Sequence, residues 1–136
     1  MAAVLETLKQ SPFQTRLLTG QTGVEINDIR LQDMSDENVE ATRRLVGEYC
    51  VGVFPNQNLS PEDQLEFVSR FGKITKTPGV DMRSGFDFVH VVADRGDPDH
   101  PVSGGFHTDT CFVETPPSFS TLHAIDVPSH GGDTIF

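Results

Sequence analysis

The sequence has few cysteines, which cross-link small secreted proteins, and lacks the long apolar stretches that anchor proteins in membranes. It contains two cysteines, Cys50 and Cys111, too few for a disulfide framework. We therefore expect two reduced thiols in a cytoplasmic protein, because the cytosol keeps thiols reduced. A secretory signal has a basic start followed by an apolar stretch, and the first residues of this sequence lack that pattern. No apolar stretch in the sequence is long enough to span a bilayer. These absences exclude a disulfide-rich scaffold and favour a soluble protein.

Basic residues are also scarce, since 10 Lys and Arg stand against 20 Asp and Glu, for a formal net charge of −10. Such a chain is repelled by phosphate backbones and by anionic membrane surfaces. No basic stripe offsets this charge, so we expect neither nucleic acid nor membrane as a partner. A small anionic substrate stays compatible with the charge, because a pocket sets its own local field. The oligomeric state, including a homo-oligomer, is left open.

Two helices are predicted in the first half by their capping residues. Ser35 stands at an N-cap position before two acidic residues, and apolar residues follow at helical spacing over 36–49. Ser60 and Pro61 open a second helix, which ends near Gly72. The other elements expected before this point are a weak, frayed start and two short strands, at residues 1–16, 23–27 and 51–54.

The second half is expected to consist of loops and strands. Turn residues predict loops at 73–85 and 94–105, and β-branched and aromatic residues predict strands at 86–92, 120–127 and 134–136. The last strand opens directly after a Gly-Gly turn and has no partner in the sequence that follows, which is a liability for a sheet edge. We therefore expect a truncated chain, a single partial domain over residues 1–136, in preference to a natural short terminus.

His107 and Asp109 form a His-x-Asp triplet between two phenylalanines. If this segment is extended, both side chains point to the same side, about 7 Å apart along the strand. An imidazole and a carboxylate can then converge on one ion at roughly 2.0–2.2 Å. With a second histidine, such ligands form the facial triad that holds iron(II). The triplet alone is weak evidence, because a surface histidine beside an aspartate is its ordinary interpretation.

The residues around this triplet follow a definite order. Phe106 precedes it, Phe112 follows Asp109 by three positions, a Pro-Pro pair stands at 116–117 and Gly-Gly-Asp-Thr at 131–134. Three earlier segments belong to the same pattern: Gly-Val-Phe-Pro-Asn-Gln at 52–57, Leu-Ser-Pro-Glu-Asp at 59–63 and Arg-Phe-Gly at 70–72. Together these motifs closely resemble the taurine dioxygenase (TauD/TfdA) family of iron(II)- and 2-oxoglutarate-dependent dioxygenases. The resemblance covers about residues 20 to 136.

The resemblance implies an α+β, mostly β fold: a double-stranded β-helix (jelly roll) with N-terminal helices, here truncated. It implies that His107 and Asp109 bind iron(II), and that Thr134 hydrogen-bonds a carboxylate of the cosubstrate 2-oxoglutarate. In the family, a second histidine ligand and an arginine that pairs with 2-oxoglutarate lie in a C-terminal half that this sequence does not contain. We therefore expect the chain alone to be inactive.

Four other histidines are the remaining candidates for a third metal ligand within this sequence: His90, His100, His123 and His130. A lone histidine is more often a packed or surface residue than a ligand. His123 lies in a predicted strand, where it could face the interior. For all four, packing or surface exposure remains the favoured interpretation.

The resemblance also indicates positions near the substrate. Taurine-type members carry a histidine and a tyrosine in the loop that here reads Thr-Pro-Gly-Val at 77–80, and an asparagine where this chain has Ser103. Taurine is therefore not the expected substrate, and we place Thr77, Val80 and Ser103 near the substrate. Three basic residues flank this loop, either as attractors of an anionic substrate or as solvated charges: Lys73, Lys76 and Arg83.

The implied reaction is hydroxylation of a small organic substrate, which an anionic group would suit, with release of succinate and CO2. Asp109 favours hydroxylation, because related halogenases replace the metal carboxylate by a small residue. The implied partners are the substrate, 2-oxoglutarate and O2. Two alternatives stay open: a non-catalytic relative that acts as a binding or interaction protein, and a zinc-binding hydrolytic site.

Overall fold

The computed structural model describes residue 8 and residues 10–79, 87–92, 105–131 and 133–136. The chain divides into two compact units, Met1–Val91 and Val92–Phe136. Several predicted features lie outside the described residues: most of the loop at 94–105, together with Val80, Arg83, His100 and Ser103.

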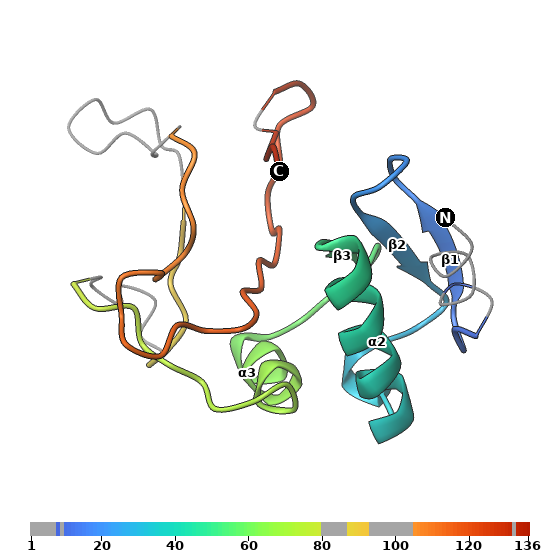
Figure 1. The fold of residues 1–136 in the computed structure, drawn as a ribbon, viewed down its shortest axis with the longest axis horizontal. Helices are drawn as coiled ribbons and strands as arrows, with labels where there is room; N and C mark the ends of the chain where they lie inside the picture. The colour runs from blue at the N-terminus through green and yellow to red at the C-terminus, as the bar shows by residue number, and fades with distance from the viewer. Residues whose placement is uncertain (1–7, 9, 80–86, 93–104, 132) are drawn as a thin grey trace. The chain divides into compact units, whose positions relative to one another are not determined.

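The first unit contains a three-stranded sheet in the order β1-β2-β3 (Figure 1). β2, Val24–Asn27, confirms the predicted strand, because the alternation of its side chains buries Val24 and Ile26 completely. β3, Gly52–Val53, pairs with β2 in parallel. It is shorter than the strand predicted at 51–54.

β1, Gln14–Leu17, is not predicted by the sequence, because it combines one apolar residue with three polar ones. It pairs with β2 in the antiparallel direction, and this register places Arg16 opposite Glu25. The Arg16 guanidinium donates to the Glu25 carboxylate over 2.6 Å, which makes a cross-strand pair of opposite charges. The expectation of a frayed start is therefore wrong for residues 14–16.

Both predicted helices form, and their first turns contain the predicted caps. α2, Asp36–Tyr49, begins where the Ser35 hydroxyl accepts the backbone N–H three residues ahead over 3.2 Å. α3, Pro61–Ser69, begins with a capping box: Asp63 N–H donates to the Ser60 hydroxyl over 3.1 Å, and Ser60 N–H donates to the Asp63 carboxylate over 2.9 Å. No helix in the described residues has both the length and the apolar character that a bilayer crossing requires.

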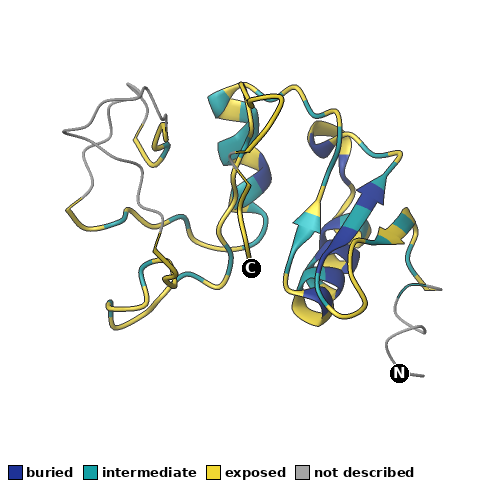
Figure 2. Cartoon of the chain, turned by 90° about the horizontal axis from the view of Figure 1, so that it is seen from above, coloured by how far each residue is buried: buried dark blue, intermediate teal, exposed yellow. Residues whose placement is uncertain are grey.

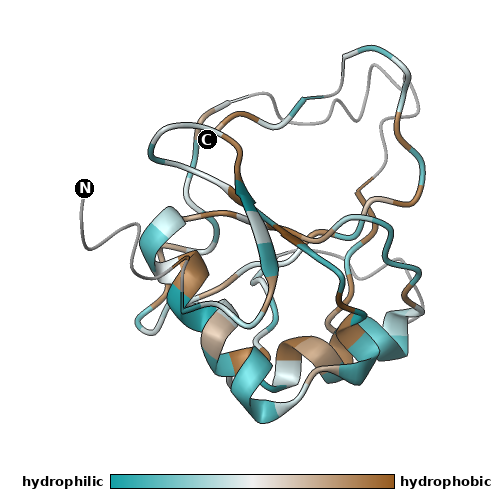
Figure 3. Ribbon diagram, turned by 90° about the vertical axis from the view of Figure 1, so that its right-hand side faces the viewer, coloured by the Kyte–Doolittle hydropathy of each residue, from teal (hydrophilic) through white to brown (hydrophobic). Residues whose placement is uncertain are grey.

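Apolar side chains of the first unit form two neighbouring clusters. One joins β2 to α2 and consists of Val24, Ile26, Leu45 and Tyr49. The other joins the short 3-10 helix η1 (Leu31–Asp33) to α2 and α3 and consists of Leu31, Met34, Val39 and Phe67. Phe13, Ile29 and Phe54 pack against both, so the core is continuous. Figure 2 shows the buried residues (dark blue) on these strands and helices, and Figure 3 shows hydrophobic residues (brown) interspersed with hydrophilic ones along the helices.

Two arginines join α2 to α3. From α2, Arg43 donates to the Phe71 carbonyl with both Nη atoms over 3.2 Å, and its guanidinium lies 5.5 Å from the centre of the Phe71 ring. In return, Arg70 donates to the Met34 carbonyl and, over 2.6 Å, to the Asp36 carboxylate. A cation is favourable at the C-terminal carbonyls of a helix. This reciprocal pairing fixes the end of α3 against the start of α2.

The second unit contains no helix or strand in its described residues, which are residue 92 and residues 105–131 and 133–136. The strands predicted at 120–127 and 134–136 are therefore wrong for this structure, and the described residues 87–92 also lack the strand predicted at 86–92. A strand forms only when a neighbouring strand accepts and donates its backbone hydrogen bonds, which propensity alone does not supply. The described structure is an α+β arrangement of a small mixed sheet and two helices, and the jelly roll stays a prediction.

Candidate metal site

The His-x-Asp triplet leads into a turn instead of an extended strand. Residues 109–112 form this turn, in which Thr110 has a φ of 50° and its carbonyl accepts the Val113 N–H over 3.4 Å. The structure assigns no strand to residues 107 and 109. Their side chains nevertheless meet, since His107 Nε2 lies 3.1 Å from Asp109 Oδ1. The two predicted ligands therefore come together at the start of the turn.

The second ring nitrogen of His107 is also engaged. Its Nδ1 lies 2.8 Å from the Gly105 carbonyl oxygen, and because a carbonyl can only accept, Nδ1 carries the proton. This bond raises the pKa of His107, and the Asp109 carboxylate raises it further. The neutral imidazole then points a lone pair from Nε2 toward the acceptor Oδ1. Two lone pairs repel each other at the 3.1 Å that separates His107 Nε2 from Asp109 Oδ1. This short distance is therefore favourable only if Nε2 carries a proton or if one cation binds both atoms.

This arrangement fits a divalent metal ion. Two ligands that bind at roughly 2.0–2.2 Å on adjacent corners of an octahedron are about 3.0 Å apart, close to the 3.1 Å between His107 Nε2 and Asp109 Oδ1. Histidines that bind metals almost always donate their other N–H to a carbonyl or carboxylate, as His107 does to Gly105. Sequence reasoning missed Gly105, because a backbone carbonyl leaves no signal in residue type. Both ligand side chains are more than half exposed, which leaves room for further ligands.

The other histidines do not complete the pair. His90 and His130 are exposed, and His123 is half-buried and engaged in an interaction of its own, whereas His100 lies outside the described residues. In the ranges that the structure describes, no group of three or more histidine, cysteine or acidic side chains is placed to hold an ion. The site therefore has two ligands from this part of the chain.

Two of the four residues predicted at the cosubstrate and substrate are described. Thr134 is exposed and belongs to the same unit as the metal pair. Thr77 is half-buried in the first unit. Val80 and Ser103 lie outside the described residues, so their predicted roles are not tested.

Lys76 is already paired within the first unit. Its Nζ lies 2.8 Å from Asp87 Oδ1 and 5.0 Å from the centre of the Phe88 ring. These contacts favour a structural role for Lys76 over attraction of a substrate. Lys73 is exposed, and Arg83 lies outside the described residues.

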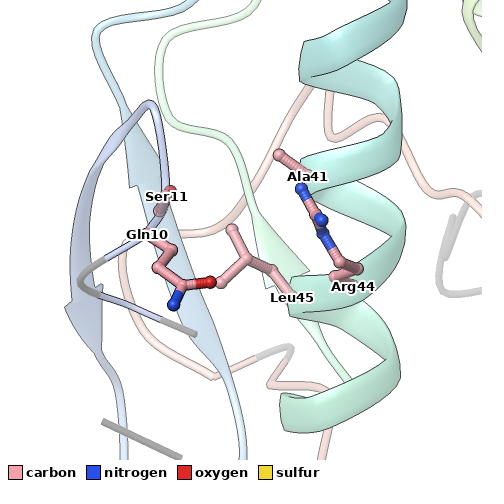
Figure 4. Close-up of a pocket in the computed structure, with 5 residues that line it drawn as sticks. All are labelled: Gln10, Ser11, Ala41, Arg44 and Leu45. Atoms are coloured by element: carbon pink, nitrogen blue, oxygen red, sulfur yellow. The ribbon is translucent and has the colours of Figure 1, made fainter. Parts of the chain in front are cut away.

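The sequence does not predict the small pocket beside α2 in the first unit (Figure 4). Its volume is about 70 Å³, and its lining consists of Gln10, Ser11, Ala41, Arg44 and Leu45. Sites for small molecules measure roughly 300–1,000 Å³. The pocket is therefore too small for an organic substrate.

Comparison with known proteins places these residues in a family context. The chain matches the family model described as "Taurine catabolism dioxygenase TauD, TfdA family" over residues 14–136. It is 33% identical to an alpha-ketoglutarate-dependent sulfonate dioxygenase of Saccharomyces cerevisiae, over 91% of this chain and 33% of that protein. It is 32% identical to an alkylsulfatase of Acinetobacter baylyi, over 96% of this chain and 42% of that protein. The chain thus spans less than half the length of these curated relatives.

Among solved structures, the chain is similar to a crystal structure of AAD-2 in complex with Mn(II) and N-oxalylglycine. The TM-score is 0.48 at 18% sequence identity, and the match covers 54% of this chain and 26% of that one. A similarity at this level does not establish a shared fold.

Proposed function

We propose that this chain, which belongs to the taurine catabolism dioxygenase TauD, TfdA family, supplies part of the active site of an iron(II)- and 2-oxoglutarate-dependent dioxygenase. One observation carries the proposal: His107 Nε2 and Asp109 Oδ1 lie 3.1 Å apart, while His107 Nδ1 is turned to the Gly105 carbonyl. Iron(II) and 2-oxoglutarate are the metal and cosubstrate of this family, and a mixed set of imidazole and carboxylate suits iron(II).

The two ligands have different roles at the metal. The Gly105 carbonyl keeps the proton of His107 on Nδ1, so that Nε2 presents its lone pair to the ion. Asp109 adds a negative charge that offsets part of the charge of iron(II). With 2-oxoglutarate and O2, the bound iron supplies the oxidising chemistry for substrate hydroxylation, with release of succinate and CO2. Two ligands from this chain leave positions for a third protein ligand, the cosubstrate and O2.

The remaining predicted residues complete the proposal. We place Thr134 at a carboxylate of 2-oxoglutarate, to which its exposed hydroxyl can donate, and Thr77, Val80 and Ser103 at the substrate. A jelly roll is the proposed fold of the complete domain, supported by family membership. The second histidine ligand and the arginine that the resemblance calls for are not in this sequence. These 136 residues therefore provide the active site only in part.

A small organic anion is the proposed substrate class. The two curated relatives are named for a sulfonate and for an alkyl sulfate, and both kinds of compound are anionic. Because Lys76 is paired with Asp87, the exposed Lys73 is the better candidate to attract such an anion to the segment around Thr77.

The cytoplasm is the proposed compartment. Cys50 and Cys111 are both free and exposed, which supports an environment that keeps thiols reduced. The net charge of −10 supports small molecules as partners, in preference to nucleic acid or anionic membranes.

The test is oxygen-dependent release of succinate from 2-oxoglutarate with added iron(II), measured on the longest polypeptide that the coding sequence of this chain specifies. We expect His107→Ala and Asp109→Ala to lower turnover at least about a hundredfold, because even the loss of an outer-shell partner costs roughly 10–100-fold. Asp126→Ala, at an exposed acidic residue outside the pair, is the matched control and should leave turnover unchanged.

Two results would overturn the proposal. One is turnover that survives both ligand substitutions. The other is hydrolysis that needs zinc and no O2, which would favour the hydrolytic alternative. If the wild-type polypeptide neither binds iron(II) nor releases succinate, the non-catalytic alternative replaces the enzyme.

A further inference from the structure

Residues 73–79 follow α3 and include Thr77, which we place at the substrate. None of these seven residues is buried: Ile74 and Thr77 are half-buried, and the other five are exposed. They form no helix or strand, so no ladder of backbone hydrogen bonds holds them. The position of such a segment therefore depends on the few side-chain contacts that it makes.

Lys76 joins this segment to residues further along the chain. Its Nζ lies 2.8 Å from Asp87 Oδ1, and it also lies 5.0 Å from the centre of the Phe88 ring. A carboxylate and the face of an aromatic ring both attract an ammonium group. We call Lys76, Asp87 and Phe88 the Lys76 cluster. The cluster belongs to the first unit, and Lys76 immediately precedes Thr77 in the chain.

The backbone of Phe88 gives an independent reason to single out this cluster. Its φ is 75°, in the left-handed region that a bulky residue rarely adopts. Phe88 is 42% exposed, so packing in a core does not account for this conformation. Such conformations persist only where surrounding contacts offset their cost, and they gather at active sites and ligand-binding segments. The contact of the Phe88 ring with the Lys76 ammonium is a contact of this kind.

We propose that Lys76, Asp87 and Phe88 are positioning residues, which fix the backbone at Lys76 and thereby hold the adjacent Thr77 in place for the substrate. The proposal rests on the proposed function, in which Thr77 lies at the substrate. A binding residue that is already ordered loses less conformational freedom when the substrate binds. The cluster therefore acts on KM and leaves kcat nearly unchanged, because an equal loss of binding in the ground state and the transition state changes KM alone.

A role in charge alone is the competing account of the same residues. In that account Asp87 merely masks the charge of Lys76, and its removal would leave a free cation near an anionic substrate and lower KM. If the cluster positions Thr77, removal of Asp87 breaks the ion pair and raises KM. The two accounts thus predict changes of opposite sign for Asp87→Asn.

The experiment measures succinate release with added iron(II) on the longest polypeptide that the coding sequence specifies, with hexyl sulfate or hexanesulfonate, whichever is turned over faster. Asp87→Asn and Phe88→Leu should each raise KM about two- to fivefold, because one exposed ion pair or cation–π contact is worth about that factor. Lys76→Gln loses both contacts and should raise KM about five- to twentyfold. Lys76→Arg retains both and should stay within about twofold of the wild type. In all four variants kcat should change by less than about twofold.

A second readout follows the cluster without any turnover. A methylene group over an aromatic ring has an upfield-shifted NMR signal, so selectively labelled lysine should show this shift for Lys76 in the wild type and lose it in Phe88→Leu and Asp87→Asn. Asp28→Asn, at an exposed aspartate of the same unit outside the cluster, is the matched control and should change neither KM nor the signal. Tyr49 is the single tyrosine and is buried in the first unit, so its fluorescence reports whether each variant is folded.

Two results would overturn the inference: an unchanged or lowered KM in Asp87→Asn, or a wild-type Lys76 signal without the ring shift. Failure of the proposed function looks different. A wild type that releases no succinate refutes the enzyme, and the positioning role with it, whereas an active Asp87→Asn with unchanged KM refutes the positioning role alone.

Discussion

Residues 10–79 and residues 105–136 contain similar apolar side chains in opposite environments. In the first range, Leu45 is 1% exposed and packs with Val24 and Ile26 of β2. In the second, Leu122 and Ile125 are almost fully exposed. This difference in burial corresponds to a difference in backbone hydrogen bonding. The first range has paired strands and capped helices, whereas the second has turns and bends in its described residues. Apolar composition therefore predicts where burial is needed, whereas burial itself requires a neighbouring element.

This difference matters for the candidate metal site, which lies in the region without a core. The position of His107 depends on local contacts, with Asp109 and with the Gly105 carbonyl. A metal site needs its ligands held by packed neighbours if its geometry is to stay productive.

The largest expected difference between the two regions comes from the same substitution in each. Leu45→Ala should lower the free energy of unfolding by about 2–5 kcal/mol, because it opens a cavity in the core. Leu122→Ala should change it by less than about 0.5 kcal/mol, because an exposed side chain loses few contacts. Urea denaturation, followed by Tyr49 fluorescence and by circular dichroism, measures both. Equal losses would break the comparison, because Leu122 would then have to be buried in solution.

Local signals in the sequence predicted the helices and the caps. Ser35 and Ser60 act within one turn of their own positions, so their effect can be predicted without knowledge of tertiary contacts. β1 could not be predicted in this way, because its strand structure depends on pairing with β2. The segment at 120–127 shows the converse: its residues favour a strand, but pairing is missing in the described structure.

At the candidate site, the motif predicted which residues meet but not how they meet. The side chains of His107 and Asp109 are in contact at the start of the turn formed by residues 109–112. The sequence does not predict the positive φ of Thr110, because a threonine rarely adopts such a backbone conformation. The hydrogen bond from His107 to the Gly105 carbonyl could not be predicted either, because every residue has a backbone carbonyl.

Gln57 offers a second test, since one side chain orders two loops of the first unit. Its Nε2 donates to the carbonyls of Ile29 and Pro55 over 2.9 Å each, and its Oε1 accepts the Leu31 N–H over 3.1 Å. Gln57→Ala should cost about 1–3 kcal/mol of unfolding free energy, because three half-buried backbone groups lose their partner. Gln21→Ala, in an exposed turn, is the control and should stay within about 0.5 kcal/mol. If both variants unfold at the same urea concentration, loop order in this unit does not depend on Gln57.

A smaller effect, of opposite sign, is expected inside the core. Thr42 is 2% exposed, and its Oγ1 has no hydrogen-bond partner among the described residues. Thr42→Val keeps the shape and removes the unpaired hydroxyl, so it should raise the stability of the first unit by about 1 kcal/mol. Thr42→Ser keeps the hydroxyl and loses a methyl group, so it should lower stability by about 0.8 kcal/mol. A loss of stability in Thr42→Val, measured by thermal unfolding, would mean that water or another group satisfies the hydroxyl.

The smallest expected effect concerns acid and the start of α3. The Ser60 N–H and hydroxyl hydrogen-bond the Asp63 carboxylate and hold the pKa of Asp63 below its ordinary value. A carboxyl group with a lowered pKa in the folded state stabilises that state above the unfolded pKa, and this contribution is lost as pH falls through the folded pKa. Hydrogen exchange of the α3 amides should therefore speed up between about pH 5 and pH 3, after correction for the intrinsic rate. Asp63→Asn should flatten this dependence, whereas Glu62→Gln, an exposed neighbour outside the capping box, should retain it. The described residues of the second unit have no capped helix, so an equal acid response there would show that the effect does not arise from the cap.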